Sequence, residues 1–199
     1  MSRRNRPYAG ADARTRQARA RGYPARSVFK LEEIDRRYRL LSAGQHVLDL
    51  GAAPGSWTKY ASERVGSRGL VLAVDLRQIE QRFASNVRVL VADALSLDAT
   101  EIERLGPYDV VLSDLAPSTS GSKVRDQTRS YDLFMQALKV AAMLGRSGSA
   151  MVGKIFMGPD FQSARRAVGE RYDHTTVARP SGTRQASSEV FIVGRGLRK

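Results

Sequence analysis

Short apolar runs alternate with amphipathic segments along most of this chain, and this alternation restricts the fold more than any other feature of the sequence. Runs typical of buried strands occupy residues 46–50, 70–76, 87–91, 108–113 and 150–156. Two further strands are expected near 175–178 and 189–193. Helix-like segments separate the runs, and one of them, 131–144, has Ser130 as a candidate N-cap and Gly145 as a stop. This order of elements predicts a mostly parallel sheet with helices on both faces.

The first part of the chain differs in composition from the rest. Residues 1–30 contain nine Lys or Arg side chains and one Asp. We therefore expect residues 1–22 to form a flexible basic arm and residues 23–199 to form a single domain. From Ser27 onward, apolar residues recur at helical spacing, with Ser27 as a candidate N-cap. The arm favours nucleic-acid binding over a solubilising role alone, although an Arg-rich, acid-poor start is also typical of organellar transit peptides.

The charge of the whole chain points to a polyanionic partner. Its 33 Lys and Arg residues exceed its 20 Asp and Glu residues, and the net charge of +13 favours a nucleic acid or an acidic membrane surface. No apolar segment approaches the length that spans a membrane, so a soluble, cytoplasmic protein is expected. The chain has no Cys and only two His, which excludes thiolate metal sites and a cysteine nucleophile and disfavours a His-rich metal site or a Ser/His/Asp triad. We expect no metal centre.

The first predicted strand ends in a sequence typical of a cofactor loop. In residues 49–57 (DLGAAPGSW), Gly51 and Gly55 allow a sharp turn and a close approach to a ligand. The loop lacks G-x-G-x-x-G and the G-K-[ST] of a P-loop, so the motifs that bind phosphate groups are missing. Asp75 stands at the end of the second predicted strand, and Asp93 comes just after the third. Carboxylates at consecutive strand ends predict a pocket for a nucleoside.

Trp57 and Asp114 complete the candidate pocket. Trp57, the only Trp, is either a core residue or a residue that shapes the pocket. Asp114 is the first carboxylate after the fourth predicted strand, and Ala116 and Ser118 stand where amino-methylating enzymes have an aromatic residue to stack on the target base. The absence of Cys excludes thiolate attack on cytosine C5. The candidate cofactor-binding residues are Gly51, Gly55, Trp57, Asp75, Asp93 and Asp114.

Three further charged residues stand next to apolar sequence. Lys154 is embedded in the fifth predicted strand, Lys30 lies beside the apolar stripe of the first helix, and Glu189 begins the last strand. Each of them taken alone has an ordinary structural explanation, such as a lysine that extends from a strand end toward solvent. Their combination is more informative than any one of them.

Taken together, these motifs resemble the FtsJ (RrmJ-like) family of ribosomal-RNA 2′-O-ribose methyltransferases. The resemblance covers about residues 21–195 and includes DLGAAPGSW, VDL, SDLAPSTSG and KIF. It implies a Rossmann-like methyltransferase fold with a seven-stranded, mostly parallel sheet, and S-adenosylmethionine as the methyl donor. It also implies a catalytic tetrad of Lys30, Asp114, Lys154 and Glu189. The chain departs from the family at Ser56, where a second glycine is usual, so a slightly altered loop is expected.

The resemblance also implies a substrate. Bacterial members act on a uridine in the A-loop of 23S rRNA, so we expect 2′-O-ribose methylation there, with ribosomal RNA or the large ribosomal subunit as partner, no membrane and a monomeric enzyme. The family assigns the proton acceptor to Lys154, which can deprotonate a ribose hydroxyl only in its neutral form. Two alternatives stay open at this point. An NAD-dependent oxidoreductase would lack its G-x-G-x-x-G motif, and a non-catalytic RNA-binding ribosome-assembly protein would not need a buried lysine.

Overall fold

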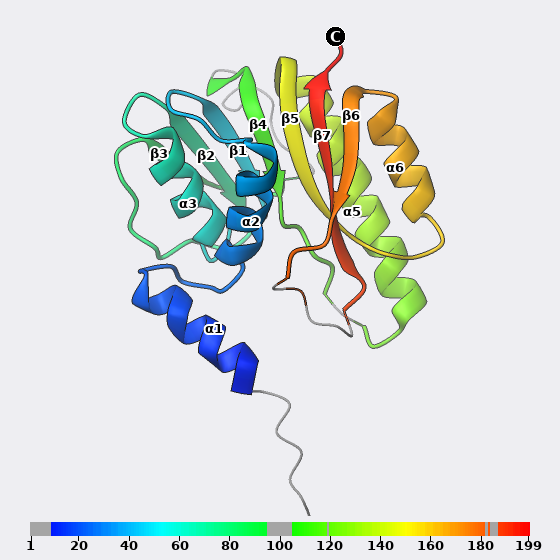
Figure 1. Cartoon of the computed structure of the whole chain (residues 1–199), viewed down its shortest axis with the longest axis horizontal. Helices are drawn as coiled ribbons and strands as arrows, with labels where there is room; N and C mark the ends of the chain where they lie inside the picture. Colours follow the sequence, from blue (N-terminus) through cyan, green and yellow to red (C-terminus); the bar gives the residue numbers. More distant parts are fainter. Residues whose placement is uncertain (1–8, 95–104, 119, 182, 184–186) are drawn as a thin grey trace, which may run out of the picture.

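Seven strands form one sheet in the order β3-β2-β1-β4-β5-β7-β6 (Figure 1). The computed structural model in which they are seen describes residues 9–94, 105–118, 120–181, 183 and 187–199. Every strand runs parallel to the others except β7, which is antiparallel to β5 and β6. The predicted mostly parallel sheet is confirmed. The strands are β1 (His46–Leu50), β2 (Leu70–Asp75), β3 (Val87–Val91), β4 (Tyr108–Ser113), β5 (Gly145–Phe156), β6 (Tyr172–Ala178) and β7 (Glu189–Leu197).

The register brings the last residues of four strands to one edge of the sheet. Leu50 at the end of β1 pairs with Val74 of β2 and with Ser113 of β4, and Asp75 pairs with Val91 of β3. We call this edge the carboxyl end of the sheet and the opposite edge the amino end. The segments that follow the four strands therefore meet at the carboxyl end, which is where open parallel sheets bind ligands.

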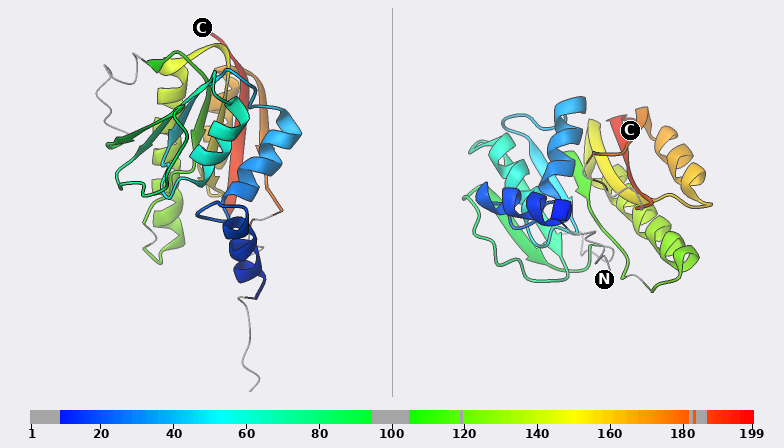
Figure 2. Two further views of the ribbon diagram at one scale, coloured as in Figure 1. Left: turned by 90° about the vertical axis from the view of Figure 1, so that its left-hand side faces the viewer. Right: turned by 60° about the horizontal axis from the view of Figure 1, so that its bottom comes forward.

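Helices cover both faces of the sheet (Figure 2). On one face lie α2 (Val28–Tyr38) and α3 (Ser56–Val65), and on the other lie α5 (Lys123–Leu144) and α6 (Phe161–Gly169). Successive side chains of a strand point to opposite faces, so the strands contribute to both apolar cores. On β5, for example, the side chain of residue 152 joins the α2/α3 core, whereas that of residue 151 joins the α5/α6 core. Burial on both faces explains the continuous apolar runs of the sequence.

The basic arm contains a helix that the sequence analysis did not predict. α1 (Ala9–Ala20) lies beyond the carboxyl end of the sheet (Figure 1). Its side chains are mostly those of Ala and Arg, two of the strongest helix formers. Ala18 is fully buried and belongs to the same apolar core as Tyr23. The structure thus differs from the flexible arm expected over residues 1–22, because helix propensity compensates for the shortage of large apolar residues; residues 1–8 lie outside the described part.

The start of α5 also differs from the prediction. The helix begins at Lys123, well before the predicted N-cap Ser130, because its first two turns are polar and carry no apolar periodicity. The carboxylate of Asp126 accepts hydrogen bonds from the N–H and the hydroxyl of Ser120, both at 2.8 Å, and so anchors this first turn. Ser130 is buried, and its hydroxyl accepts a hydrogen bond from the N–H of Phe156 at 2.9 Å. It therefore connects α5 to β5 instead of capping the helix.

None of the described helices is both long enough and apolar enough to cross a lipid bilayer. The same part of the chain contains no group of three or more His, Asp or Glu side chains that could hold a metal ion.

Candidate active site

A cavity of about 450 Å³ opens at the carboxyl end of the sheet, between the segments that follow β1, β2, β3 and β4. This volume is in the range typical of small-molecule sites. Four of the predicted cofactor residues line it, namely Gly51, Asp75, Asp93 and Asp114. The remaining lining is largely apolar and includes Leu76, Ala94, Leu115 and Pro117. The cavity thus combines three carboxylates with an apolar surface that suits a flat aromatic ligand.

The two predicted loop glycines occupy positions that other residues would not fit. Gly51 has a φ of +75°, and a Cβ atom there would lie 2.8 Å from the side chain of Leu115, which lines the cavity. Gly55 has a φ of +102°, and a Cβ atom there would lie 2.8 Å from the ring of Phe83. At both positions a residue other than glycine would be strained and would clash with a neighbouring side chain. Gly51 lines the cavity, whereas Gly55 is not among its lining residues.

Asp75 orders the backbone that lines the cavity. It is buried, and its two carboxylate oxygens accept hydrogen bonds from the N–H groups of Ala53 and Arg77, each at 2.8 Å. Ala53 belongs to the loop between β1 and α3, so Asp75 ties this loop to the end of β2. A carboxylate offers about four acceptor positions. Asp75 therefore retains acceptor capacity for a ligand after it has ordered the loop.

Asp49 is a buried carboxylate that the sequence analysis did not propose as a site residue. It is fully buried one residue before the end of β1, and its Oδ2 accepts a hydrogen bond from the hydroxyl of Thr58 at 2.7 Å. Its Oδ1 has no hydrogen-bond partner among the described residues. Burial raises the pKa of Asp49, the hydrogen bond from Thr58 opposes this effect, and the nearby carboxylates of Asp114 and Asp75 add to it, so that the pKa is about 7. Its place inside DLGAAPGSW was visible in the sequence, but its unpaired oxygen was not.

Trp57 packs in the core instead of lining the cavity. Its side chain is 2% exposed, its indole N–H donates to the carbonyl of Ser27 at 2.9 Å, and its ring lies 5.6 Å from that of Phe191. Of the two interpretations that the sequence left open, these contacts favour the core residue. Trp57 attaches the start of α2 to α3, and α2 carries Lys30.

Ser56, the departure from the family pattern, connects the cofactor loop to the segment that follows α1. Its side chain is buried, and its hydroxyl both accepts from the N–H of Ala25 at 2.8 Å and donates to the carbonyl of Ala25 at 3.1 Å. The same segment is held at Tyr23, whose hydroxyl donates to Glu63 at 2.5 Å, and at Gly22, whose carbonyl accepts from Lys59 at 2.7 Å. We call residues 21–27 the linker. Ser56, the first residue of α3, therefore attaches the linker to this helix.

Lys154 and Asp114 form a close ion pair at the edge of the cavity. Lys154 lies in β5, one residue after Gly153, which pairs with Ser113 of β4, so the register places Lys154 beside Asp114. Its Nζ donates to the backbone carbonyl of Asp114 at 2.5 Å and to Oδ1 of Asp114 at 2.9 Å. The Lys154 side chain is only 7% exposed, and that of Asp114 is 21% exposed. A buried ammonium group is stable only with such partners.

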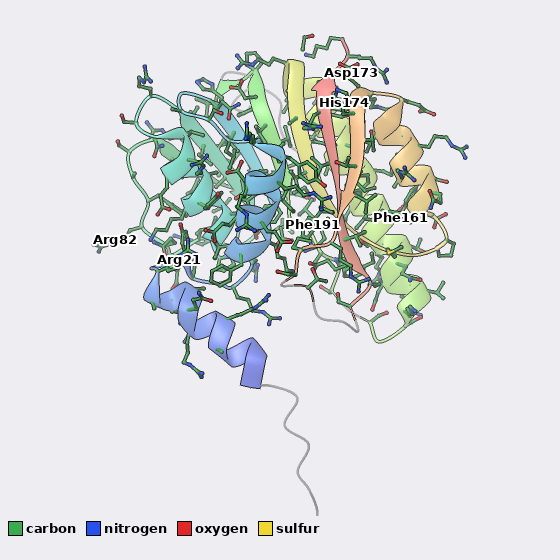
Figure 3. All side chains as sticks on the ribbon, in the orientation of Figure 1. Arg21, Arg82, Phe161, Asp173, His174 and Phe191 are labelled. Carbon is green, nitrogen blue, oxygen red and sulfur yellow. The ribbon has the colours of Figure 1, made fainter. Side chains whose placement is uncertain are left out.

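Lys30 and Glu189 form a second ion pair on the same face of the sheet. The Nζ of Lys30, on α2, donates to Oε1 of Glu189, the first residue of β7, at 2.5 Å. The two pairs are linked through Phe191, which pairs with Lys154 across the two strands. The Nζ of Lys30 lies 5.9 Å from the centre of the Phe191 ring, and Figure 3 labels this ring beside α2. The fold thus brings the four predicted catalytic residues together from α2, the β4 end, β5 and β7.

Solved structures share this architecture. A Plasmodium falciparum structure described as a ribosomal RNA methyltransferase superimposes with a TM-score of 0.78 at 19% identity, covering 88% of this chain and 98% of that chain. Aeropyrum pernix fibrillarin, solved in complex with S-adenosyl-L-methionine, gives a TM-score of 0.55 at 15% identity, covering 78% of this chain and 68% of that chain. These likenesses show the fold, which is that of the Rossmann-like methyltransferases, as the resemblance predicted.

The sequence comparisons specify the family. The model of the FtsJ-like methyltransferase family matches residues 23–197. A protein of Sorangium cellulosum (strain So ce56) named Ribosomal RNA large subunit methyltransferase E is 57% identical over 188 residues, which cover 94% of this chain and 89% of that protein. A protein of the same name from Syntrophobacter fumaroxidans is 44% identical, with 96% and 98% covered. The chain therefore belongs to the FtsJ-like methyltransferase family. It is an S-adenosylmethionine-dependent methyltransferase, and neither alternative class is favoured.

The cavity fits this cofactor chemically. S-adenosylmethionine carries a sulfonium and an ammonium cation, a ribose with two hydroxyl donors and a flat adenine. Carboxylates suit the cations and the ribose hydroxyls, and Asp75, Asp93 and Asp114 line the cavity. Leu76 and Ala94 add apolar surface for a flat ring.

Proposed function

We propose that this protein transfers a methyl group to a ribose 2′-hydroxyl of RNA, and that its target is a uridine in the A-loop of 23S rRNA. The observation that carries the proposal is the buried Lys154–Asp114 pair at the cavity edge, with the Lys30–Glu189 pair beside it. A base-methylating site would need a platform for a flipped base, and Ala116 and Ser118 supply none. The relatives named as ribosomal RNA large subunit methyltransferases support ribosomal RNA as the substrate class.

The geometry of Lys154 suits a general base. In the ion pair with Asp114 the side chain is an ammonium group with three N–H donors, so it acts as a base only after it has released one proton to solvent. The resulting neutral amine has two N–H donors and one lone pair. The carbonyl and the carboxylate of Asp114 accept both N–H donors, so the lone pair is directed away from Asp114. In the proposed reaction this lone pair accepts the proton of the 2′-hydroxyl, and Asp114 stabilises the ammonium group that results. When bound, S-adenosylmethionine supplies the methyl group at its sulfonium centre.

The second ion pair has a positioning role in this proposal. Lys30 and Glu189 lie 16% and 13% exposed, so both side chains are fixed while part of each still reaches solvent. Glu189 offers an acceptor and Lys30 a donor to the hydroxyl groups of a ribose. Fixing the ribose in attack geometry can supply several kcal/mol of the reduction in the barrier.

The basic arm completes the proposed RNA-binding surface. α1 lies beyond the carboxyl end of the sheet, where the active site opens, and it carries Arg14, Arg16 and Arg19. We propose that residues 23–199 form the catalytic domain and that α1 contacts phosphates of the RNA near the target. In this proposal the enzyme acts as a monomer, because its four proposed catalytic residues come from one chain. Its proposed location is the cytoplasm.

Single-turnover transfer of a labelled methyl group to unmodified ribosomal RNA and to large-subunit particles tests the proposal. Nuclease digestion followed by mass spectrometry should place the label on the 2′-oxygen of a uridine. Label on a base would contradict the reaction class. Label on the ribose of another nucleotide would retain the chemistry and contradict the target.

A further inference from the structure

A second hollow lies at the amino end of the sheet, opposite the active site. Its volume is about 350 Å³, and it is lined by the C-terminal end of α2, the residues before β1, and residues of β4, β5 and β7. Three arginines reach it, namely Arg39, Arg146 and Arg195, and we call it the amino-end groove. His174, the register partner of Arg195, marks this end in Figure 3, whereas Arg21 next to α1 marks the other.

Two of the three arginines have no anionic partner among the described residues. Arg146 forms an ion pair with Asp109, a buried carboxylate that also accepts the N–H of His46 at 2.8 Å. Asp109 is the only carboxylate among the groove's lining residues. The guanidinium groups of Arg39 and Arg195 make no hydrogen bond or ion pair with the described residues. The groove therefore has an excess of about two positive charges.

One of these guanidinium groups lies beside an aromatic ring. The guanidinium carbon of Arg195 lies 5.8 Å from the centre of the Tyr38 ring, and that of Arg37 lies 5.3 Å from the same ring. A cation–π contact uses none of the hydrogen-bond donors of a guanidinium group, so its N–H groups can still donate. Two such N–H groups match two oxygens of one phosphate.

The backbone conformation of Arg39 also indicates a function for its side chain. Its φ of 52° and ψ of 55° are left-handed, and it is the one non-glycine residue with a positive φ in the described part of the chain. Glycine is the usual residue at this helix-terminal position, and a side chain there costs conformational energy. The turn itself is held by Asp35, whose carboxylate accepts from the N–H groups of Leu40 and Leu41 at 3.0 and 2.9 Å. Nothing in the turn requires a guanidinium group.

We propose that the amino-end groove binds a phosphate of the RNA substrate, as a second contact remote from the active site. This inference rests on the proposed function, since it takes the RNA to be the polyanion that the chain binds. Residues 150–154 of β5 are regularly paired and cover about 13 Å at ~3.3 Å per residue, whereas residues 145–150 match only two steps of β4, from Tyr108 to Val110, and add about 7 Å. The two sites are therefore about 20 Å apart, and an RNA strand that occupies both spans at least about six bases at ~3.4 Å per base.

The test uses a variant that removes both free guanidinium groups without harming the fold. Arg39→Gly suits the left-handed backbone, and Arg195→Gln keeps most of the side chain that covers Tyr38. The matched control is Arg165→Gln with Arg166→Gln, which removes two exposed positive charges from α6 on the opposite face. Thermal unfolding should show a Tm for Arg39→Gly that is equal to or above that of the original protein.

The affinity for long RNA is measured over a range of salt concentrations. For the Arg39→Gly/Arg195→Gln variant we expect about tenfold weaker binding and a log–log salt slope lower by about 0.7, because one phosphate contact is lost. In the control variant, the loss of affinity and the change in salt slope should both be less than half as large. An RNA of about four nucleotides around the target, too short to reach the groove, should bind both variants equally. The single-turnover rate at saturating RNA should not change, because neither arginine belongs to the catalytic site.

Three results would overturn the inference. These are an unchanged salt slope with long RNA, an equal loss of affinity in the control, or a loss that is as large with the short RNA. If inorganic phosphate binds the groove but long RNA keeps its affinity in the variant, the groove is a small-anion site and the inference also fails. Failure of the proposed function can be distinguished from failure of this inference. If the proposed function fails, no label appears on ribose, whereas the RNA-binding measurements still show whether the groove contacts RNA.

Discussion

The two ends of the sheet hold their charged residues in opposite ways. At the carboxyl end Lys154 and Lys30 are largely buried, and each is paired with a carboxylate. At the amino end Arg39 is exposed, Arg195 is half-buried, and neither has an ion-pair partner among the described residues. A buried charge requires a partner, and the pair in turn fixes its geometry. In the two proposals, charges are therefore fixed where a proton is moved and left free where a phosphate binds.

The largest effect should follow from breaking the buried pair at Lys154. Lys154→Ala removes the proposed base and should lower the single-turnover rate by about 10²–10⁴ with little change in S-adenosylmethionine affinity. Lys154→Arg should not restore activity, because a guanidinium group keeps its proton. Lys139→Ala, which removes an exposed lysine on α5, is the control. A near-normal rate for Lys154→Ala would contradict the proposed mechanism.

Changes in the cavity carboxylates should have the next largest effect. Asp93→Ala and Asp75→Ala should weaken S-adenosylmethionine binding by about one to two decades, the cost of a lost hydrogen bond to a charged group. Asp75→Ala should also lower thermal stability, because Asp75 holds the N–H groups of Ala53 and Arg77. Calorimetric titration measures the affinities, with Asp173→Ala at the amino end as the control. Unchanged affinity in both cavity variants would show that the cofactor binds elsewhere.

A smaller effect is expected from the arginines of α1. Replacement of Arg14, Arg16 and Arg19 by Gln keeps the helix propensity and should lower the salt slope of RNA binding by about 2. Because α1 and the amino-end groove are far apart, the free-energy changes of the two sets of substitutions should add within about 0.5 kcal/mol. Competition binding of the combined variant measures this sum. A strongly non-additive result would mean that the two ends do not contact the RNA independently.

The most specific prediction concerns Asp49 and the stability of the fold. Its pKa of about 7 lies above the value of an unfolded Asp, so the folded state binds the additional proton. Its contribution to stability is therefore fully present below about pH 4 and is lost as the pH rises to about 7. Asp49→Asn should remove this dependence, so the variant should gain stability relative to the original protein between pH 4 and 7. Urea unfolding across this range measures the difference, and a constant difference would show that Asp49 titrates normally.

The sequence predicted the carboxyl end far better than the amino end. Asp75, Asp93 and Asp114 each follow an apolar run, so strand periodicity and the rule for parallel sheets were enough to bring them together. The amino-end groove combines Arg39, Arg146 and Arg195, which belong to no local pattern and meet only through the order of the strands.

Other features also depended on three-dimensional context. The burial of Asp49 and the left-handed backbone of Arg39 are set by packing, which periodicity does not encode. α1 was missed because a basic segment with few large apolar residues resembles a disordered one. The core position of Trp57 depends on the approach of the linker to α3, which sequence spacing does not reveal.

Ser56 has a consequence for how parts of this enzyme could be exchanged with those of its relatives. The hydroxyl of Ser56 forms hydrogen bonds with both the N–H and the carbonyl of Ala25. Position 56 and the linker therefore form one structural unit, although some thirty residues separate them in sequence. A chimaera that takes residues 1–27 from a relative with glycine at this position would inherit a linker shaped for a different neighbour. The exchange should therefore succeed only when residue 56 is transferred together with the arm.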